Sequence, residues 1–121
     1  MSTTKRDLGQ RGEQLATAYL RGQGYGIVTT NWRCAHGELD IVARKDETLV
    51  FVEVRTRRAA GTDEAFESVN PHKQNRLERL AYAYLDAHNL HEADWRVDVI
   101  GVAISSSGRP LIEHVENALG W

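Results

Sequence analysis

The stretch between residues 37 and 57 constrains the fold more than any other part of this 121-residue chain. Two runs rich in apolar and β-branched residues, 38–44 and 49–55, flank a polar segment at 45–48, which is the pattern of a β-hairpin. Neither Asp46 nor Glu47 readily takes the positive φ that a two-residue hairpin turn requires, so we expect a four-residue loop at the tip.

A turn that is symmetric about its two central residues also fixes the register of the hairpin. It pairs Asp40 with Glu53, with their Cβ atoms roughly 4.5–5.5 Å apart, and Glu38 with Arg55. A slip of one residue would turn the apolar set of one strand away from the core, so the alternation supports this register. The apolar residues then share one face: Leu39, Ile41, Ala43, Val50, Val52 and Val54.

Two carboxylates that face each other on neighbouring strands repel unless a cation lies between them. One interpretation is a structural ion network, in which Arg55 neutralises both Asp40 and Glu53. The other is that both carboxylates hold a hard divalent cation such as Mg²⁺, which takes oxygen ligands and keeps several waters. The hairpin residues alone leave both interpretations open.

The same residues resemble the nuclease signature written PD-(D/E)xK, with Asp40 as its first acid, Glu53 as its second and Arg55 at its basic position. More narrowly, the chain resembles the YraN-type family of bacterial endonuclease-like proteins, which is similar in fold to archaeal Holliday junction resolvases. The resemblance covers nearly the whole chain. Besides the hairpin it rests on four short motifs, at residues 9–13, 31–33, 73–74 and 96–99.

The resemblance implies a restriction-endonuclease-like core and metal-dependent hydrolysis of DNA phosphodiester bonds. Asp40, Glu53 and the first-helix residue Glu13 would hold Mg²⁺ or Mn²⁺. The cation would lower the pKa of a bound water and stabilise the charge that develops on the phosphate. The implied catalytic set is completed by Arg55, and a junction-cleaving role would require a homodimer.

Arg55 departs from the signature, which normally has lysine at this position. Arginine can hold a phosphate, but it is never deprotonated in proteins and cannot serve as a general base. Catalysis would then depend on the water itself or on Lys73 from the second predicted helix. A non-catalytic nucleic-acid-binding module that retains the nuclease fold is therefore the alternative.

The remaining elements predict an α/β fold with a mixed sheet of about five strands flanked by helices, in one domain over residues 1–121. We expect a helix over 7–22, with Asp7 as N-cap, in which Gly9 and Gly12 allow close approach to the sheet. The further expected elements are a strand at 25–31, a helix from Pro71 to about His88 with Asn70 as N-cap, and strands at 95–104 and 111–115. Asp98, inside an apolar strand, is expected to pair with Arg96 or Arg55.

The overall charge does not indicate a nucleic-acid-binding protein, because the net charge is −2 and the pI is near 6.2. Local cations could nevertheless follow a phosphate backbone, although a solvated helix flank explains part of the pattern equally well. The residues concerned are Arg55, Arg57, Arg58, Lys73, Arg76 and Arg79.

The sequence also bears on redox chemistry and location. Cys34 is the only cysteine, which excludes an intramolecular disulfide, and no second pair of ligands accompanies Cys34 and His36 to form a structural zinc site. There is no long apolar run and no signal-peptide pattern, so we expect a cytoplasmic protein without a membrane partner.

Overall fold

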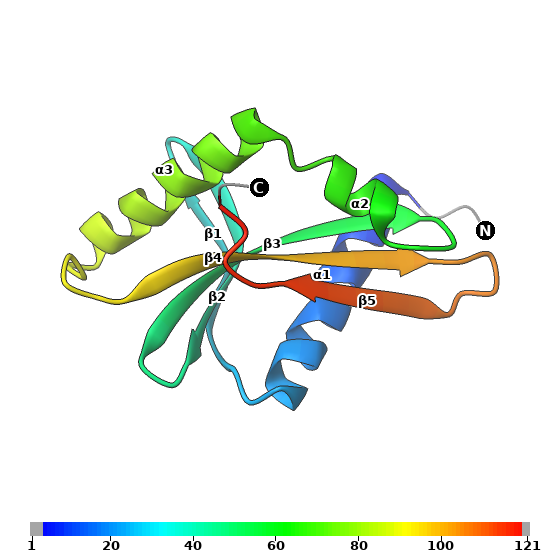
Figure 1. Ribbon diagram of the computed structural model, residues 1–121, viewed down its shortest axis with the longest axis horizontal. Coiled ribbons are helices and arrows are strands. Elements are labelled where there is room, and N and C mark those ends of the chain that lie inside the picture. The colour runs from blue at the N-terminus through cyan, green and yellow to red at the C-terminus, as the bar shows by residue number, and fades with distance from the viewer. Residues whose placement is uncertain (1–3, 120–121) are drawn as a thin grey trace.

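A five-stranded mixed β-sheet forms the centre of the fold, with helices on both faces (Figure 1). The structure is a computed structural model and describes residues 4–119. The predicted α/β architecture is confirmed. In chain order the elements are α1 (Lys5–Gly22), β1 (Gly26–Cys34), β2 (Gly37–Lys45), β3 (Thr48–Arg58), α2 (Asp63–Glu67), α3 (Pro71–Ala87), β4 (Trp95–Ile104) and β5 (Pro110–Val115).

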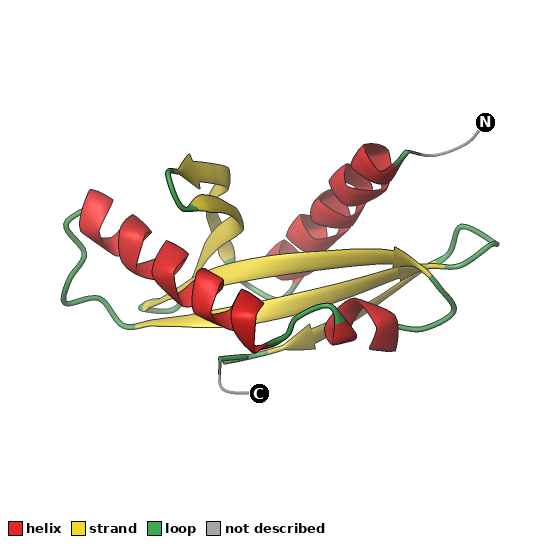
Figure 2. Cartoon of the chain, turned by 90° about the horizontal axis from the view of Figure 1, so that it is seen from above, coloured by secondary structure: helices red, strands yellow, loops and turns green. Residues whose placement is uncertain are grey.

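The strands lie in the sheet in sequence order, β1-β2-β3-β4-β5. Neighbours are antiparallel except β3 and β4, which are parallel and are joined by the crossover that carries α2 and α3. Figure 2 shows α1 on one side of the sheet and α2 with α3 on the other. As expected from its apolar composition, β4 lies in the interior of the sheet.

Each face of the sheet has its own apolar core. The face toward α1 buries Ala16 and Leu20 of that helix against residues such as Ile41, Val52 and Ile100. The face toward α3 buries the apolar side of that helix against Val42, Phe51 and Val99. The α3 residues are Leu77, Leu80, Ala81, Tyr84 and Leu85.

One of the two predicted glycine contacts holds α1 close to the sheet. A Cβ built on Gly12 would overlap Thr56 Oγ1 and lie 2.8 Å from Thr56 Cβ, so only glycine permits this approach. The same role for Gly9 is wrong, because no atom would lie within 4 Å of its Cβ. Gly9 instead lines an open groove between α1 and the end of β3.

The helix caps agree with the sequence for α3 and differ for α1. Asn70 is the N-cap of α3, and its side chain accepts a hydrogen bond of 3.1 Å from Lys73 N, with Pro71 as the first helical residue. In α1 the N-cap is Thr4, whose hydroxyl accepts from Asp7 N at 3.0 Å. Asp7 therefore lies in the first turn, where its charge still favours the positive end of the helix dipole.

Replacing Asn70 by alanine is expected to reduce the free energy of unfolding by about 1 kcal/mol, because Lys73 N loses its partner. Urea unfolding followed by circular dichroism measures this change. Asn70→Asp keeps the acceptor and serves as control. An unchanged urea midpoint in Asn70→Ala would contradict the role of Asn70 as the N-cap of α3.

The tip of the β2–β3 hairpin is tighter than expected. Lys45 pairs with Thr48, so the loop contains only Asp46 and Glu47, and the predicted four-residue loop is wrong. Asp46 has a φ of 53°, which aspartate tolerates because its short side chain can bond to nearby backbone. The first strand is also longer than expected and continues to Cys34, past Asn31, which has a φ of 55°.

The hairpin opens half-way along its length. The predicted register is confirmed from Lys45 to Ile41, which pairs with Val52, and the β2–β3 ladder ends there. Beyond that point β2 stays paired with β1, whereas β3 continues beside β4. The expected pairing of Glu38 with Arg55 is wrong, since Glu38 forms an ion pair of 2.8 Å with Arg33 of β1.

Among the residues that the structure describes, no helix combines the length and the apolar character that a membrane crossing requires.

Candidate functional site

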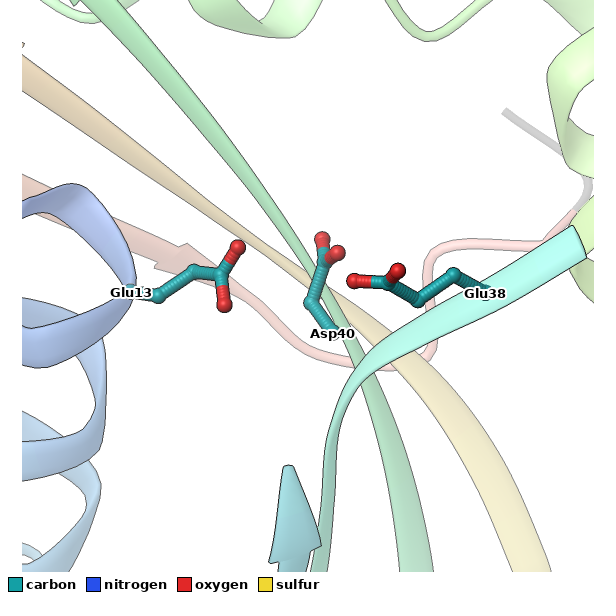
Figure 3. A group of neighbouring side chains, drawn as sticks. All are labelled: Glu13, Glu38 and Asp40. Carbon is teal, nitrogen blue, oxygen red and sulfur yellow. The ribbon is translucent and has the colours of Figure 1, made fainter. Parts of the chain in front are cut away.

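Three carboxylates meet where β2 leaves β3. Glu13 comes from α1, and Glu38 and Asp40 come from β2; each can place one oxygen within 4.8 Å of the others. In Figure 3 the Glu13 and Glu38 side chains approach Asp40 from opposite sides. We call these three residues the acidic cluster.

The opening of the hairpin makes this meeting possible. The β2–β3 ladder ends before Asp40, but the side chains of Asp40 and Glu53 still share a hydrogen bond, and Asp40 Oδ2 accepts a further one of 2.8 Å from Val54 N. The side chain thus takes the place of a missing strand partner. Glu13, from α1, can place an oxygen within 4.8 Å of Asp40 at this point.

Asn31 joins two members of the acidic cluster. With its amide nitrogen turned toward them, it donates 2.8 Å hydrogen bonds to Glu13 Oε1 and to Glu38 Oε1. This orientation follows from the hydrogen-bond network, because the opposite one would place oxygen against oxygen. The left-handed backbone of Asn31 accompanies this placement at the edge of the sheet.

The environment of Asp40 disfavours its ionised form. Burial, the charge of Glu53 and a hydrogen bond shared with Glu53 raise the pKa of Asp40 to about 9, although the bond from Val54 N acts in the other direction. Asp40 in the folded protein therefore holds its proton to a higher pH than a free aspartate does.

Glu13 shares this environment. Burial and the charge of Glu38 raise the pKa of Glu13, the bond from Asn31 opposes them, and the charge of Glu53 raises it further. Glu13 and Asp40 thus both favour the neutral form more than a free carboxyl group does. A divalent cation would relieve this repulsion, and oxygen donors are those that Mg²⁺ and Mn²⁺ prefer. The residues present therefore fit such a cation.

Glu53 has different partners. Its side chain is 6% exposed, and its Oε2 atom lies 2.9 Å from Arg55 Nη2 and 3.6 Å from Arg76 Nη2. Glu53 thus connects the acidic cluster, through Asp40, to the cations of β3 and α3. The structural ion network that the sequence allowed describes Glu53, whereas the partners of Asp40 within residues 4–119 are Val54 N and Glu53 and include no arginine.

Cations gather on the α3 side of Glu53. Partial burial and the charges of Arg55, Arg76 and Arg57 lower the pKa of Lys73, while Glu53 acts against them. We call Arg55, Arg57, Lys73 and Arg76 the basic cluster. The two other predicted cations lie elsewhere: Arg58 lines a separate hollow with Ile104 and Ser105, and Arg79 lines another on α3.

Two donors of the basic cluster are buried and lack a hydrogen-bond partner within residues 4–119, namely Arg55 Nε and Arg76 Nε. Buried N–H groups are nearly always paired in proteins. Two unpaired ones beside an acidic cluster suit a site whose anionic ligand supplies acceptors.

Asp98 belongs to a separate network. It is completely buried and, as the sequence predicted, pairs with Arg96, at 3.0 Å. It also accepts from His114 Nε2 at 2.8 Å and from Asn117 N at 3.0 Å. Burial raises the pKa of Asp98, but the bonds from His114, Arg96 and Asn117 outweigh it and hold the pKa below its ordinary value. This network ties the end of the chain to β4.

The sequence profile of the uncharacterised protein family UPF0102 matches residues 12–102, which is most of the chain and includes both clusters. The chain belongs to the UPF0102 family. This confirms the resemblance to the YraN-type proteins that the sequence motifs indicated.

UPF0102 relatives match almost end to end. A UPF0102 protein of Chloroflexus aurantiacus is 48% identical over 99% of this chain and 98% of its own length. Another from Geobacter sulfurreducens is 48% identical over 92% of this chain and 87% of its own. A third from Dehalococcoides mccartyi is 42% identical over 99% and 98%.

Among solved structures, SfsA of Pyrococcus furiosus in complex with Ca²⁺ is similar at 15% identity, with a TM-score of 0.44. The match covers 93% of this chain and 63% of the SfsA chain.

The structure brings Glu13 and Asp40 together as expected of this UPF0102 chain, and it adds two residues that sequence reasoning did not assign to the site, Asn31 and Glu38. Both lie in motifs that carried the family resemblance, at 31–33 and two residues before Asp40. Their place in these motifs was the sequence signal that could have assigned both residues to the site. The register predicted from the hairpin obscured it, because it turned Glu38 toward Arg55.

Proposed function

We propose that this protein hydrolyses phosphodiester bonds of DNA with the help of a bound Mg²⁺ or Mn²⁺ ion. The observation that carries the proposal is the acidic cluster, whose carboxylate oxygens from α1 and β2 converge within 4.8 Å. The adjoining basic cluster supports it, since cations beside carboxylates suit a phosphate next to a metal ion.

Glu13, Glu38 and Asp40 would hold the cation, with Glu53 beside them. Such a cation supplies Lewis acidity, which makes a water more acidic and stabilises the charge of a phosphate. Arg55 and Arg76 would bind the phosphate through guanidinium N–H groups, which suit its oxygens. Lys73, whose pKa is lowered by burial and by neighbouring cations, is the member of the basic cluster that could exchange a proton, since the others are arginines.

A second function is favoured by one observation. Arg55 occupies the position where the nuclease signature has lysine and is held at 2.9 Å from Glu53. Because arginine cannot act as a general base, the protein could bind DNA without cleaving it. Binding that falls steeply with salt, together with no cleavage, would favour this second function.

The test is a nuclease assay with Mn²⁺ or Mg²⁺ on linear and branched DNA, together with calorimetric titration of Mn²⁺. Wild type is expected to cleave only with the metal, and Glu38→Gln is expected to bind Mn²⁺ about 10- to 100-fold more weakly because one oxygen charge is lost. Glu53→Gln is expected to disturb Mn²⁺ binding less, since Glu53 is paired with Arg55 and Arg76.

Glu47→Gln is the matched control, because Glu47 is an exposed carboxylate at the tip of the same hairpin. Equal Mn²⁺ affinity in Glu38→Gln and Glu47→Gln would contradict the acidic cluster as a metal site. No Mn²⁺ binding and no cleavage by wild type would reject the nuclease function.

A further inference from the structure

Helix α1 forms the wall of two grooves that meet at the acidic cluster. One groove, of about 400 Å³, lies between α1 and the end of β3, and its lining includes Lys5, Arg55 and Arg57. The other, of about 580 Å³, lies between α1 and β1. Glu13 lines both of them, so the acidic cluster stands at their junction.

The second groove differs in chemistry from the first. Its side chains are mainly neutral donors and acceptors: Gln10, Gln14, Thr17, Thr30 and Asn31, with Arg21 as the cation. We call this groove the polar arm. Such side chains offer few charges to phosphates, but carboxamides and hydroxyls form hydrogen bonds with base edges and sugars.

The dimensions of the polar arm fit one strand. Arg21 follows Glu13 by eight residues in α1, which corresponds to about 12 Å along the helix. This length spans about three nucleotides at the 3.4 Å spacing of a stacked strand. A groove of this volume is comparable to a small-molecule pocket, too small to enclose a duplex.

We propose that the polar arm binds unpaired nucleotides of a single DNA strand on one side of the bond to be cleaved. Gln10, Gln14 and Thr30 contact bases or sugars, and Arg21 contacts a phosphate at the far end. The basic cluster holds phosphates at the acidic cluster and beyond it. This inference rests on the proposed nuclease function and specifies its substrate as DNA with a single-stranded segment.

The polar arm can be tested without cleavage. A fluorescent ten-nucleotide single strand is titrated with wild type, Gln14→Ala and Arg21→Ala in the presence of Ca²⁺. Both side chains are exposed, so neither variant is expected to change the fold. Each is expected to raise the Kd about three- to tenfold, and Arg21→Ala also lowers the salt slope of log K by about 0.7. Arg109→Ala, an exposed arginine in the turn before β5, is the control.

The outcomes separate the polar arm from the nuclease function. Hydrolysis of the small diester bis(4-nitrophenyl) phosphate with Mn²⁺ is expected to be equal in wild type, Gln14→Ala and Arg21→Ala, because this substrate does not reach the polar arm.

Oligonucleotide affinities equal to wild type in both variants would overturn the polar arm and leave the nuclease function intact. A duplex that binds as tightly as the single strand and depends equally on Arg21 would overturn the choice of a single strand. Absence of diester hydrolysis and of Mn²⁺ binding by wild type would overturn the nuclease function, while the oligonucleotide titration would still decide the polar arm.

Discussion

Asp40→Asn is expected to stabilise the folded protein at pH 8 and, at the same time, to abolish its binding of Mn²⁺. Asparagine keeps an oxygen that accepts from Val54 N and gains an NH₂ group that can donate to Glu53. It removes the carboxylate that the surroundings disfavour. Mn²⁺ affinity and nuclease activity should each fall at least about 100-fold, because even residues outside a ligand set contribute about 10- to 100-fold.

The pH dependence follows from the pKa of Asp40, which the fold raises from 3.8 to about 9. Between these values the folded state binds a proton that the unfolded state has released, so stability falls as pH rises. The loss of stability caused by Asp40 begins near pH 4 and has reached nearly its full size at pH 9. The melting temperature of Asp40→Asn should therefore exceed that of wild type by roughly 4 °C or more at pH 8, with the difference vanishing toward pH 4.

Differential scanning fluorimetry across this pH range measures the effect, and chelator in all samples keeps cations out. Asp94→Asn, an exposed aspartate before β4, is the control and should show no pH-dependent gain. In wild type, Mn²⁺ must displace the proton of Asp40, so its affinity should rise with pH toward 9. Asp40→Asn that is less stable than wild type at pH 8 would contradict the environment described for Asp40.

The same carboxylate shows how far the sequence determined this site. Alternation of apolar residues correctly predicted the hairpin and its register up to Ile41, because a one-residue slip would have exposed half of the core. Local pattern could not predict that the ladder ends there. That end depends on β1, which holds Glu38 through Arg33 and draws β2 away from β3.

The members of the acidic cluster also differ in whether the sequence alone could identify them. Asp40 and Glu13 were found from motif positions, whereas the contributions of Asn31 and Glu38 required the path of β1. Asn31 has a left-handed backbone inside a strand, with a φ of 55°. The alternation of apolar and polar residues along a strand does not reveal such a residue. The two-residue turn at Asp46 was missed for the same reason, since its backbone conformation is uncommon for residues other than glycine.

Glu13 reaches the acidic cluster only because α1 lies close to β3, and Gly12 sets that distance. In Gly12→Ala the new Cβ would lie 2.8 Å from Thr56 Cβ and 2.9 Å from Thr56 Cγ2. Rotation of the threonine side chain cannot remove the first of these clashes, because the Cβ position is fixed by the backbone of β3. The helix must move outward, and we expect a loss of about 2 to 3 kcal/mol and roughly 10 °C in melting temperature.

Gly9→Ala is the matched control for this prediction. It lies in the same helix with no atom within 4 Å of its Cβ, and alanine favours the helix, so it should gain about 0.5 to 1 kcal/mol. Since Glu13 follows Gly12 directly, the outward shift of α1 should also weaken Mn²⁺ binding about tenfold in Gly12→Ala, measured by calorimetry at a temperature where both variants are folded. Gly9→Ala should bind Mn²⁺ as wild type does.

Equal stability of the two alanine variants would mean that α1 does not pack on Thr56. A destabilised Gly12→Ala with unchanged Mn²⁺ affinity would mean that Glu13 does not hold the cation.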